Sequence, residues 1–228
     1  FHTMTDGHLG PLADIAQDDE PNRIAEARAA AGRAIRDAGH ALAGHHAPIE
    51  LLDEFATTLN LLTSRLDAGA PRSREPVTLR SRSSGPPHDG SVMSNHDERP
   101  VSGRASPWGL DIEVRRDGDE AVATLPLRSA HEGAPGRRHG GIIAALFDEV
   151  FGFMLVIEEA ELAFTGELAM RYQAGVPIGE PLECRVRLDR RDGRKLHMTG
   201  ELMNVASGEI LARSTATFVT IDLYRFVR

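Results

Sequence analysis

The sequence is poor in cysteine and has no excess of positive charge. Its single cysteine, Cys184, rules out a disulfide within the chain, which fits a reducing compartment. Acidic residues number 34 against 26 basic ones, giving a net charge of −8, so we expect no nucleic-acid partner. No basic-then-apolar signal pattern stands near the first residues, and we therefore expect a cytoplasmic protein.

Long apolar runs and several catalytic motifs are also missing. The longest apolar run, 142–157, is short for a membrane span and contains Asp148 and Glu149, so we expect no membrane contact. The sequence has no G-x-S-x-G motif, no phosphate-binding loop and no His, Cys or carboxylate spacing typical of a metal site. We therefore expect no metal and no cofactor.

Two segments near the N-terminus have the periodicity of amphipathic helices. Apolar residues recur at spacings of three and four in 22–44, and again after Pro48, which suits the first turn of a helix. The second stripe has coiled-coil spacing and consists of Leu52, Phe55, Leu59, Leu62 and Leu66. Because such stripes usually form core, we predict a packed helical hairpin within 1–68, after a disordered start. A lid or a dimer contact for the following domain is the alternative.

A change of pattern divides the rest of the chain. Residues 69–99 are rich in Pro, Ser, Arg and Gly without periodicity, which is typical of a linker. The period then becomes two, with Asp-Gly hairpin turns at 117–118 and 192–193. One apolar stretch, 142–157, interrupts the strands and indicates a buried helix. We predict an α+β domain over 100–228, with one helix inside a curved antiparallel sheet.

The segment that leads into the apolar stretch carries the candidate chemistry. It is rich in glycine and ends in His139-Gly140-Gly141 at the predicted helix start. Helix starts present unpaired N–H groups and a partial positive charge, so the Gly141 N–H can stabilise a developing negative oxygen. Asp148 lies within the apolar helix, where an unpaired carboxylate costs several kcal/mol. It is therefore a catalytic candidate, and a buried partner or a surface position is the alternative.

These residues resemble the PaaI-like hot-dog thioesterases, which include the mammalian THEM-type acyl-CoA thioesterases. The resemblance covers about 100–222 and rests on a glycine-rich loop, His-Gly-Gly and an acidic residue nine places after the His, here Asp148. Family members also carry a Ser or Thr before the next long strand, here Thr165. Two positions depart from the pattern, because Arg138 replaces a small or apolar residue and Gly133 stands where some members have Asn.

The resemblance implies a hot-dog fold and hydrolysis of acyl-CoA thioesters to free acid and CoA. In that reaction the Gly141 N–H polarises the carbonyl, while Asp148 acts as general base or as nucleophile. Thr165 positions the water or the carboxylate. His139 orients the loop or contacts the carbonyl, unless it is simply a loop histidine bonded to backbone.

Further residues are candidates for contacts with the acyl-CoA substrate. The candidate substrate-binding residues are Gly140, Glu132, Arg138 and Glu149. The phosphates of CoA suggest a basic docking surface, either Arg137 with Arg138 or the hairpin 187–195, although a solvated charged turn is the better explanation for any one of these residues.

The spacing of the two main candidates indicates more than one chain. Gly141 and Asp148 are seven residues apart, roughly 10 Å along a helix at 1.5 Å per residue. Reacting atoms lie about 3–3.5 Å apart, so both groups cannot readily serve one carbonyl from one helix. Two antiparallel copies of the helix can, and we expect a homodimer or a dimer of dimers with shared sites. A non-catalytic acyl-CoA-binding module and a hot-dog hydratase are the alternatives, and the acyl chain is not set by the sequence.

Overall fold

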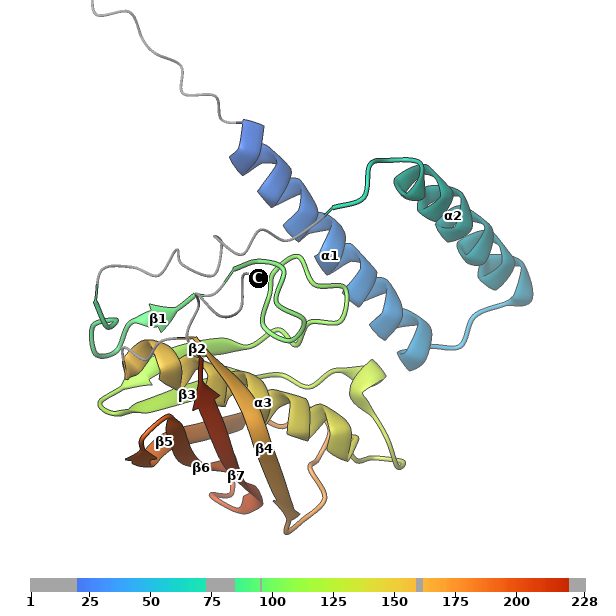
Figure 1. The fold of residues 1–228 in the computed structure, drawn as a ribbon. Coiled ribbons are helices and arrows are strands. Elements are labelled where there is room, and N and C mark those ends of the chain that lie inside the picture. The colour runs from blue at the N-terminus through green and yellow to red at the C-terminus, as the bar shows by residue number, and fades with distance from the viewer. Residues whose placement is uncertain (1–19, 73–84, 95, 159–161, 222–228) are drawn as a thin grey trace, which may run out of the picture.

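Two helices precede a strand-rich domain in the computed structural model, which describes residues 20–72, 85–94, 96–158 and 162–221 (Figure 1). In chain order the elements are α1 (Glu20–Gly44), α2 (Ile49–Asp67), β1 (Val92–Met93), β2 (Glu113–Asp117), β3 (Glu120–Leu125), the 3-10 helix η2 (Ser129–His131), α3 (Gly140–Ile157), β4 (Ala163–Tyr172), β5 (Leu182–Asp192), β6 (Lys195–Asn204) and β7 (Ile210–Thr220).

The strands form one antiparallel sheet with β4 at an edge. Its seven strands lie in the order β1-β2-β3-β5-β6-β7-β4. Both predicted Asp-Gly turns form, and the glycines take left-handed conformations, with φ of 62° at Gly118 and 55° at Gly193. From β3 the chain passes β5, β6 and β7 to reach β4 at the far edge, by way of α3, which lies along the sheet (Figure 1). This confirms the predicted α+β domain with one helix inside the sheet.

The core lies between α3 and the inward side chains of the strands. Phe147 and Phe151 of α3 are fully buried, and Phe151 meets Phe218 of β7 with ring centroids 6.5 Å apart. Within the described residues, α3 is the one helix whose length and composition would also suit a membrane span, and 61% of that stretch is buried inside the domain. A helix apolar on nearly every side is explained here by a sheet that wraps it.

Helix α1 is fastened to the strand-rich domain through a polar face. Its buried residues, Ala29, Gly32, Arg36 and His40, recur at spacings of three and four. A Cβ atom on Gly32 would lie 2.5 Å from the Ala105 carbonyl oxygen, so the two backbones are in contact. The apolar stripe that predicts the helix is not the face that packs.

Helix α2 forms as predicted, but its leucine stripe is open to solvent. None of its residues is buried, and the exposed fractions of Leu59 and Leu66 are 40% and 78%. The expected packed seam between the two helices is therefore wrong, because periodicity indicates a face that can pack and not the partner that covers it. In the segment expected to be linker, β1 pairs with β2, so the sheet begins before residue 100. The division into helical unit, linker and domain stays a prediction.

Candidate active site

The glycine-rich loop before α3 is closed by its own backbone and by one carboxylate. Gly133 N–H donates to the Arg137 carbonyl at 2.9 Å, and Gly136 N–H donates to Glu132 Oε1 at 2.7 Å. Gly136 has a φ of 74°, a conformation that favours glycine. Glu132, a predicted substrate-binding residue, thus has its carboxylate engaged in closing the loop.

His139 caps the helix that follows the loop. It is the N-cap residue of α3, and its Nδ1 accepts a hydrogen bond from Gly141 N–H at 3.0 Å. A Cβ atom on Gly141 would lie 3.0 Å from the same nitrogen, so a larger residue there would press on the imidazole ring. The N–H group predicted to polarise a carbonyl is therefore directed at an exposed histidine ring.

Strand β4 borders the start of α3 through a residue that sequence reasoning does not identify. The Tyr172 hydroxyl donates to the Gly140 carbonyl at 2.7 Å. A Cβ atom on Gly140 would lie 3.2 Å from the Tyr172 ring, which explains a glycine at this position. Only the pairing of β4 with β7 brings Tyr172 here, and the sequence around it shows nothing beyond strand periodicity.

Asp148 and Thr165 are brought together as the sequence predicts. The Thr165 hydroxyl donates to Asp148 Oδ1 at 2.7 Å, joining the middle of α3 to the start of β4. Asp148 is half-buried and Thr165 is exposed, so the carboxylate borders solvent. A carboxylate held by a hydroxyl beside an apolar helix can take a proton from water or attack a carbonyl.

Glu149, the neighbouring carboxylate, faces elsewhere, and its role in substrate binding stays a prediction. Its Oε1 lies 2.8 Å from Arg99 Nε, and the Ser102 hydroxyl also donates to it. Only 5% of Glu149 is exposed. Gly152, one turn later, leaves room for the guanidinium, since a Cβ atom there would lie 2.9 Å from Arg99 Nη2. Successive residues of a helix point about 100° apart, which separates Glu149 from Asp148.

Arg138, another predicted substrate-binding residue, is almost fully buried. It donates to the carbonyl oxygens of Leu127 and Arg128, which precede η2. Burial lowers the pKa of this guanidinium from its ordinary value. Arg138 therefore ties the end of the loop to the backbone that precedes η2, and its role toward a substrate stays a prediction.

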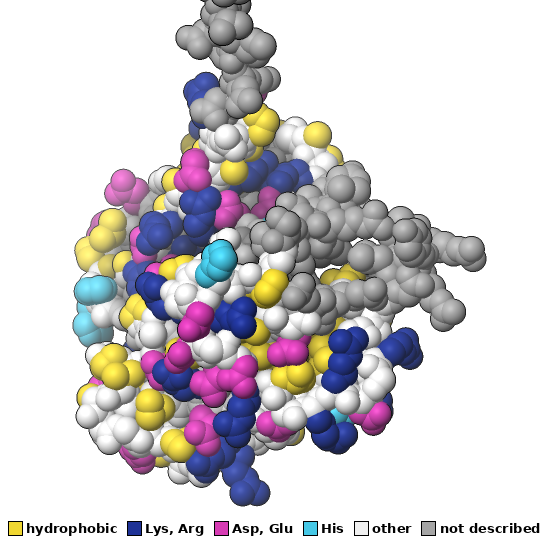
Figure 2. All heavy atoms as spheres, turned by 90° about the vertical axis from the view of Figure 1, so that its left-hand side faces the viewer, with side chains coloured by type: hydrophobic (Ala, Val, Ile, Leu, Met, Phe, Trp, Pro, Cys, Tyr) yellow, Lys and Arg dark blue, Asp and Glu magenta, His cyan; other side chains and the backbone are white. Residues whose placement is uncertain are grey.

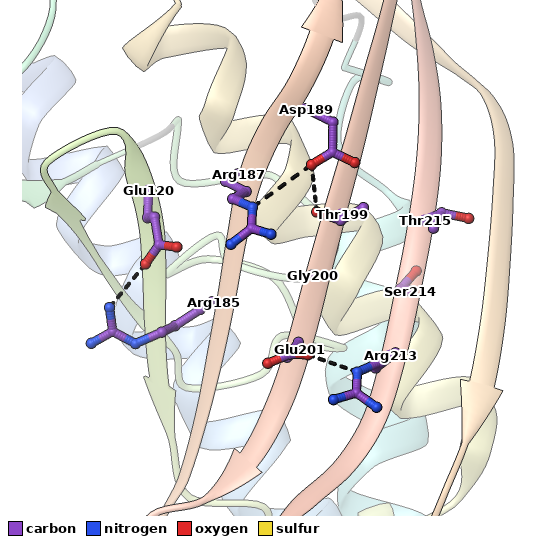
Figure 3. A pocket seen from close by; sticks show the side chains of 10 residues that line it. All are labelled: Glu120, Arg185, Arg187, Asp189, Thr199, Gly200, Glu201, Arg213, Ser214 and Thr215. Carbon is purple, nitrogen blue, oxygen red and sulfur yellow. Dashed lines mark hydrogen bonds and ion pairs between the residues drawn. The ribbon is translucent and has the colours of Figure 1, made fainter.

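The basic hairpin considered for CoA docking lies partly on the outer face of the sheet. Arg187 Nε is 3.7 Å from Asp189 Oδ1, in the shallow charged pocket of Figure 3. Val186, which directly precedes Arg187 in the sequence, points inward and is buried, so Arg187 faces away from α3. Acidic and basic side chains also lie intermixed over the face drawn in Figure 2. Arg187 is therefore not part of the group formed by Asp148 and Thr165.

One long helix wrapped by a curved antiparallel sheet defines a hot-dog fold. A crystal structure of a thioesterase superfamily protein has this fold, with a TM-score of 0.70 at 24% identity, over 84% of this chain and 90% of that chain. Residues 136–210 match the family model described as the thioesterase superfamily. This match lies within the strand-rich part of the chain and confirms the resemblance to hot-dog thioesterases seen in the sequence.

Named relatives cover a shorter part of the chain. Acyl-coenzyme A thioesterase THEM5 of Homo sapiens is 30% identical over 104 residues, which are 46% of this chain and 42% of that protein. Acyl-coenzyme A thioesterase THEM4 of Mus musculus is 28% identical over 91 residues, 40% of this chain and 39% of that protein. The chain thus spans less than half the length of these curated relatives.

Proposed function

We propose that the protein hydrolyses acyl-CoA thioesters to free acid and CoA. The observation that carries the proposal is the hydrogen bond from Thr165 to Asp148, 2.7 Å long, at the solvent border of an apolar helix. The names of the relatives THEM4 and THEM5 support the same activity. The substrate class follows from these two lines together, and the acyl chain is left open.

In the proposed reaction, a water oxygen attacks the thioester carbonyl carbon while Asp148 takes a proton from the water. The oxyanion that forms is stabilised by Gly141 N–H and by the N-terminal end of the α3 dipole. Collapse of this intermediate breaks the C–S bond, and the departing CoA sulfur takes the proton back from Asp148. Direct attack by the carboxylate is the second route.

His139 has to give way before the carbonyl oxygen can bind. Its Nδ1 accepts the hydrogen bond from Gly141 N–H in the structure, so the substrate oxygen replaces one acceptor with another. The N–H therefore has an acceptor before and after the exchange. His139 thereby orients the loop and yields its hydrogen bond to the substrate.

The proposed site is shared between two chains related by a twofold axis. Gly141 and Asp148 are separated along α3 by roughly 10 Å, too far for one carbonyl. β4, which carries Thr165, is an edge strand, and the exposed fractions of its Phe164 and Tyr172 are 45% and 49%. Joining two β4 edges would continue the sheet and set two α3 helices antiparallel.

Release of free thiol from a panel of acyl-CoAs tests the proposed function. Asp148→Asn is expected to lower kcat by at least about a hundredfold while substrate binding is largely retained. The carboxylate that is lost accepts a proton in the transition state and is not needed to bind the substrate. Asp119→Asn, on the exposed turn between β2 and β3, is the matched control and should behave as wild type. Tight acyl-CoA binding without turnover would instead identify a binding module.

A further inference from the structure

Helix α1 reaches the segment that leads into the active-site loop. The His40 imidazole accepts a hydrogen bond at Nδ1 from Ala130 N–H, 3.0 Å away. Its ring also meets the His131 ring edge-on, with centroids 4.6 Å apart. Only 7% of each histidine is exposed. A side chain 90 positions earlier in the sequence therefore holds the backbone of η2.

The same short helix η2 holds the loop from its other side. The His131 carbonyl accepts a hydrogen bond from His139 N–H at 2.9 Å. His131 Nδ1 accepts from Arg128 N–H at 3.1 Å, which fixes the turn itself. Contacts thus run without a gap from His40 to η2, from η2 to His139, and from His139 Nδ1 to Gly141 N–H.

Close packing leaves α1 little freedom to move relative to η2. A Cβ atom on Gly44 would lie 2.7 Å from Ser129 Oγ, so the end of α1 rests on the start of η2. Arg36, one turn before His40, is buried and ion-paired with Asp111 at 3.1 Å. The contact therefore behaves as a fixed support, because buried, matched groups resist displacement.

We propose that His40 is a positioning residue for the site, holding η2 so that η2 sets the His139 loop at the start of α3. This inference rests on the proposed function, and it assigns a role to a helix outside the hot-dog domain. His40 does not touch substrate. It acts through Ala130 and His131, and its effect on the reaction is the placement of Gly141 N–H.

Two amide substitutions separate this role from simple packing. Asn carries an oxygen close to the place of His40 Nδ1, whereas Gln carries it one bond farther out. Displacement of a reacting group by about 1 Å can cost up to about a hundredfold in rate. We expect His40→Gln and His40→Ala to lower kcat about tenfold or more, with KM changed less than about twofold, and His40→Asn to recover most of kcat.

The control is His46→Ala, an exposed histidine just beyond the end of α1, which should leave kcat unchanged. Wild-type kcat in a folded His40→Gln protein would overturn the proposal, and so would equal losses in the Asn and Gln variants. Should His40→Ala fail to fold, the comparison of Asn with Gln decides.

Amide hydrogen exchange keeps this test independent of the proposed function. The amides of Ala130, His139 and Gly141 should exchange faster in His40→Gln than in His40→Asn, and faster than in His46→Ala. If the wild-type protein releases no thiol from any acyl-CoA, the proposed function fails while this difference still supports the positioning role. Unchanged exchange at the three amides overturns the positioning role whatever the activity.

Discussion

Adjacent carboxylates on α3 differ in their surroundings, and the difference separates the proposed reacting residue from a stabilising one. Asp148 borders solvent and accepts from Thr165, whereas Glu149 is buried against Arg99. A buried charge that loses its partner leaves the remaining charge uncompensated. We therefore expect a substitution of Asp148 to lower the reaction rate and a substitution of Glu149 to lower the stability of the fold.

Glu149→Gln is expected to destabilise the fold by about 3 kcal/mol, because the Arg99 guanidinium is left without its counter-charge. The kcat of the folded protein should stay near that of wild type. Urea unfolding and thiol release measure the two quantities. The double variant Arg99→Met/Glu149→Met, which removes both charges, should be more stable than Glu149→Gln. If Glu149→Gln instead lowered kcat without changing stability, Glu149 would be assigned to the substrate-binding site.

At the scale of elements, the contact between α1 and η2 contains two neutral histidines. Burial lowers the pKa of His131 to about 4, and the charges of His40, Arg138 and Arg128 act in the same direction while Asp111 opposes them. Burial likewise lowers the pKa of His40, assisted by Arg128 and opposed by Asp111 and Asp37. Both Nδ1 atoms accept from backbone N–H groups, so protonation at Nδ1 would remove an acceptor.

Stability should fall as the pH is lowered from about 6.5 to about 4. The unfolded chain protonates its histidines near pH 6.5, whereas His131 in the folded protein does so only near 4, so stabilisation present above 6.5 is lost across this window. The loss from His131 is on the order of 3 kcal/mol. Urea unfolding midpoints at several pH values measure this loss. His131→Asn should make the unfolding free energy less dependent on pH across the same window. Carboxylates with lowered pKa, such as Glu26 and Asp37, respond mainly at lower pH.

Elements that depend on local chemistry were predictable from the sequence, and partners distant in the chain were not. The Asp-Gly turns at 117–118 and 192–193 form because the glycine supplies a left-handed conformation on the spot. The ion-pair partner of Glu149 was not predictable, because Arg99 lies 50 positions away in the chain. A charge in an apolar stretch signals that a partner exists, without indicating which residue supplies it.

The exposed stripe of α2 shows the same limit for a whole helix. Its leucine spacing correctly predicts a helix, because spacing is a property of the segment alone. Burial depends on what faces the segment, and no residue of α2 is buried in the described part of the chain. Helix α1 was predicted through its apolar stripe, yet it docks through Arg36 and His40.

For the whole molecule, the shared-site proposal predicts that two inactive variants rescue each other. Asp148→Ala removes the carboxylate, and Gly141→Val fills the space beside His139 Nδ1, so each homodimer should be inactive. In a mixed dimer, one of the two sites keeps an intact helix start and an intact Asp148. Random pairing gives about half heterodimers, and roughly a quarter of wild-type activity should return on co-expression.

Light scattering has to show that Gly141→Val still dimerises, because overpacking can cost a few kcal/mol. Verified heterodimers with no more activity than either parent would mean that both groups act within one chain. A monomeric protein with full activity would also show that both groups act within one chain. Either result would leave the role of Asp148 itself untouched.

The place of β4 in the sheet also sets when the site can exist during synthesis. β4 has a single neighbour in the described sheet, β7, whose residues from Ala212 to Thr220 pair with it from Tyr172 back to Ala163. A ribosome delivers α3 and β4 well before that neighbour. Until the last strand emerges, Thr165 has no sheet to hold it beside Asp148. The proposed site can therefore form only after β7 has been made.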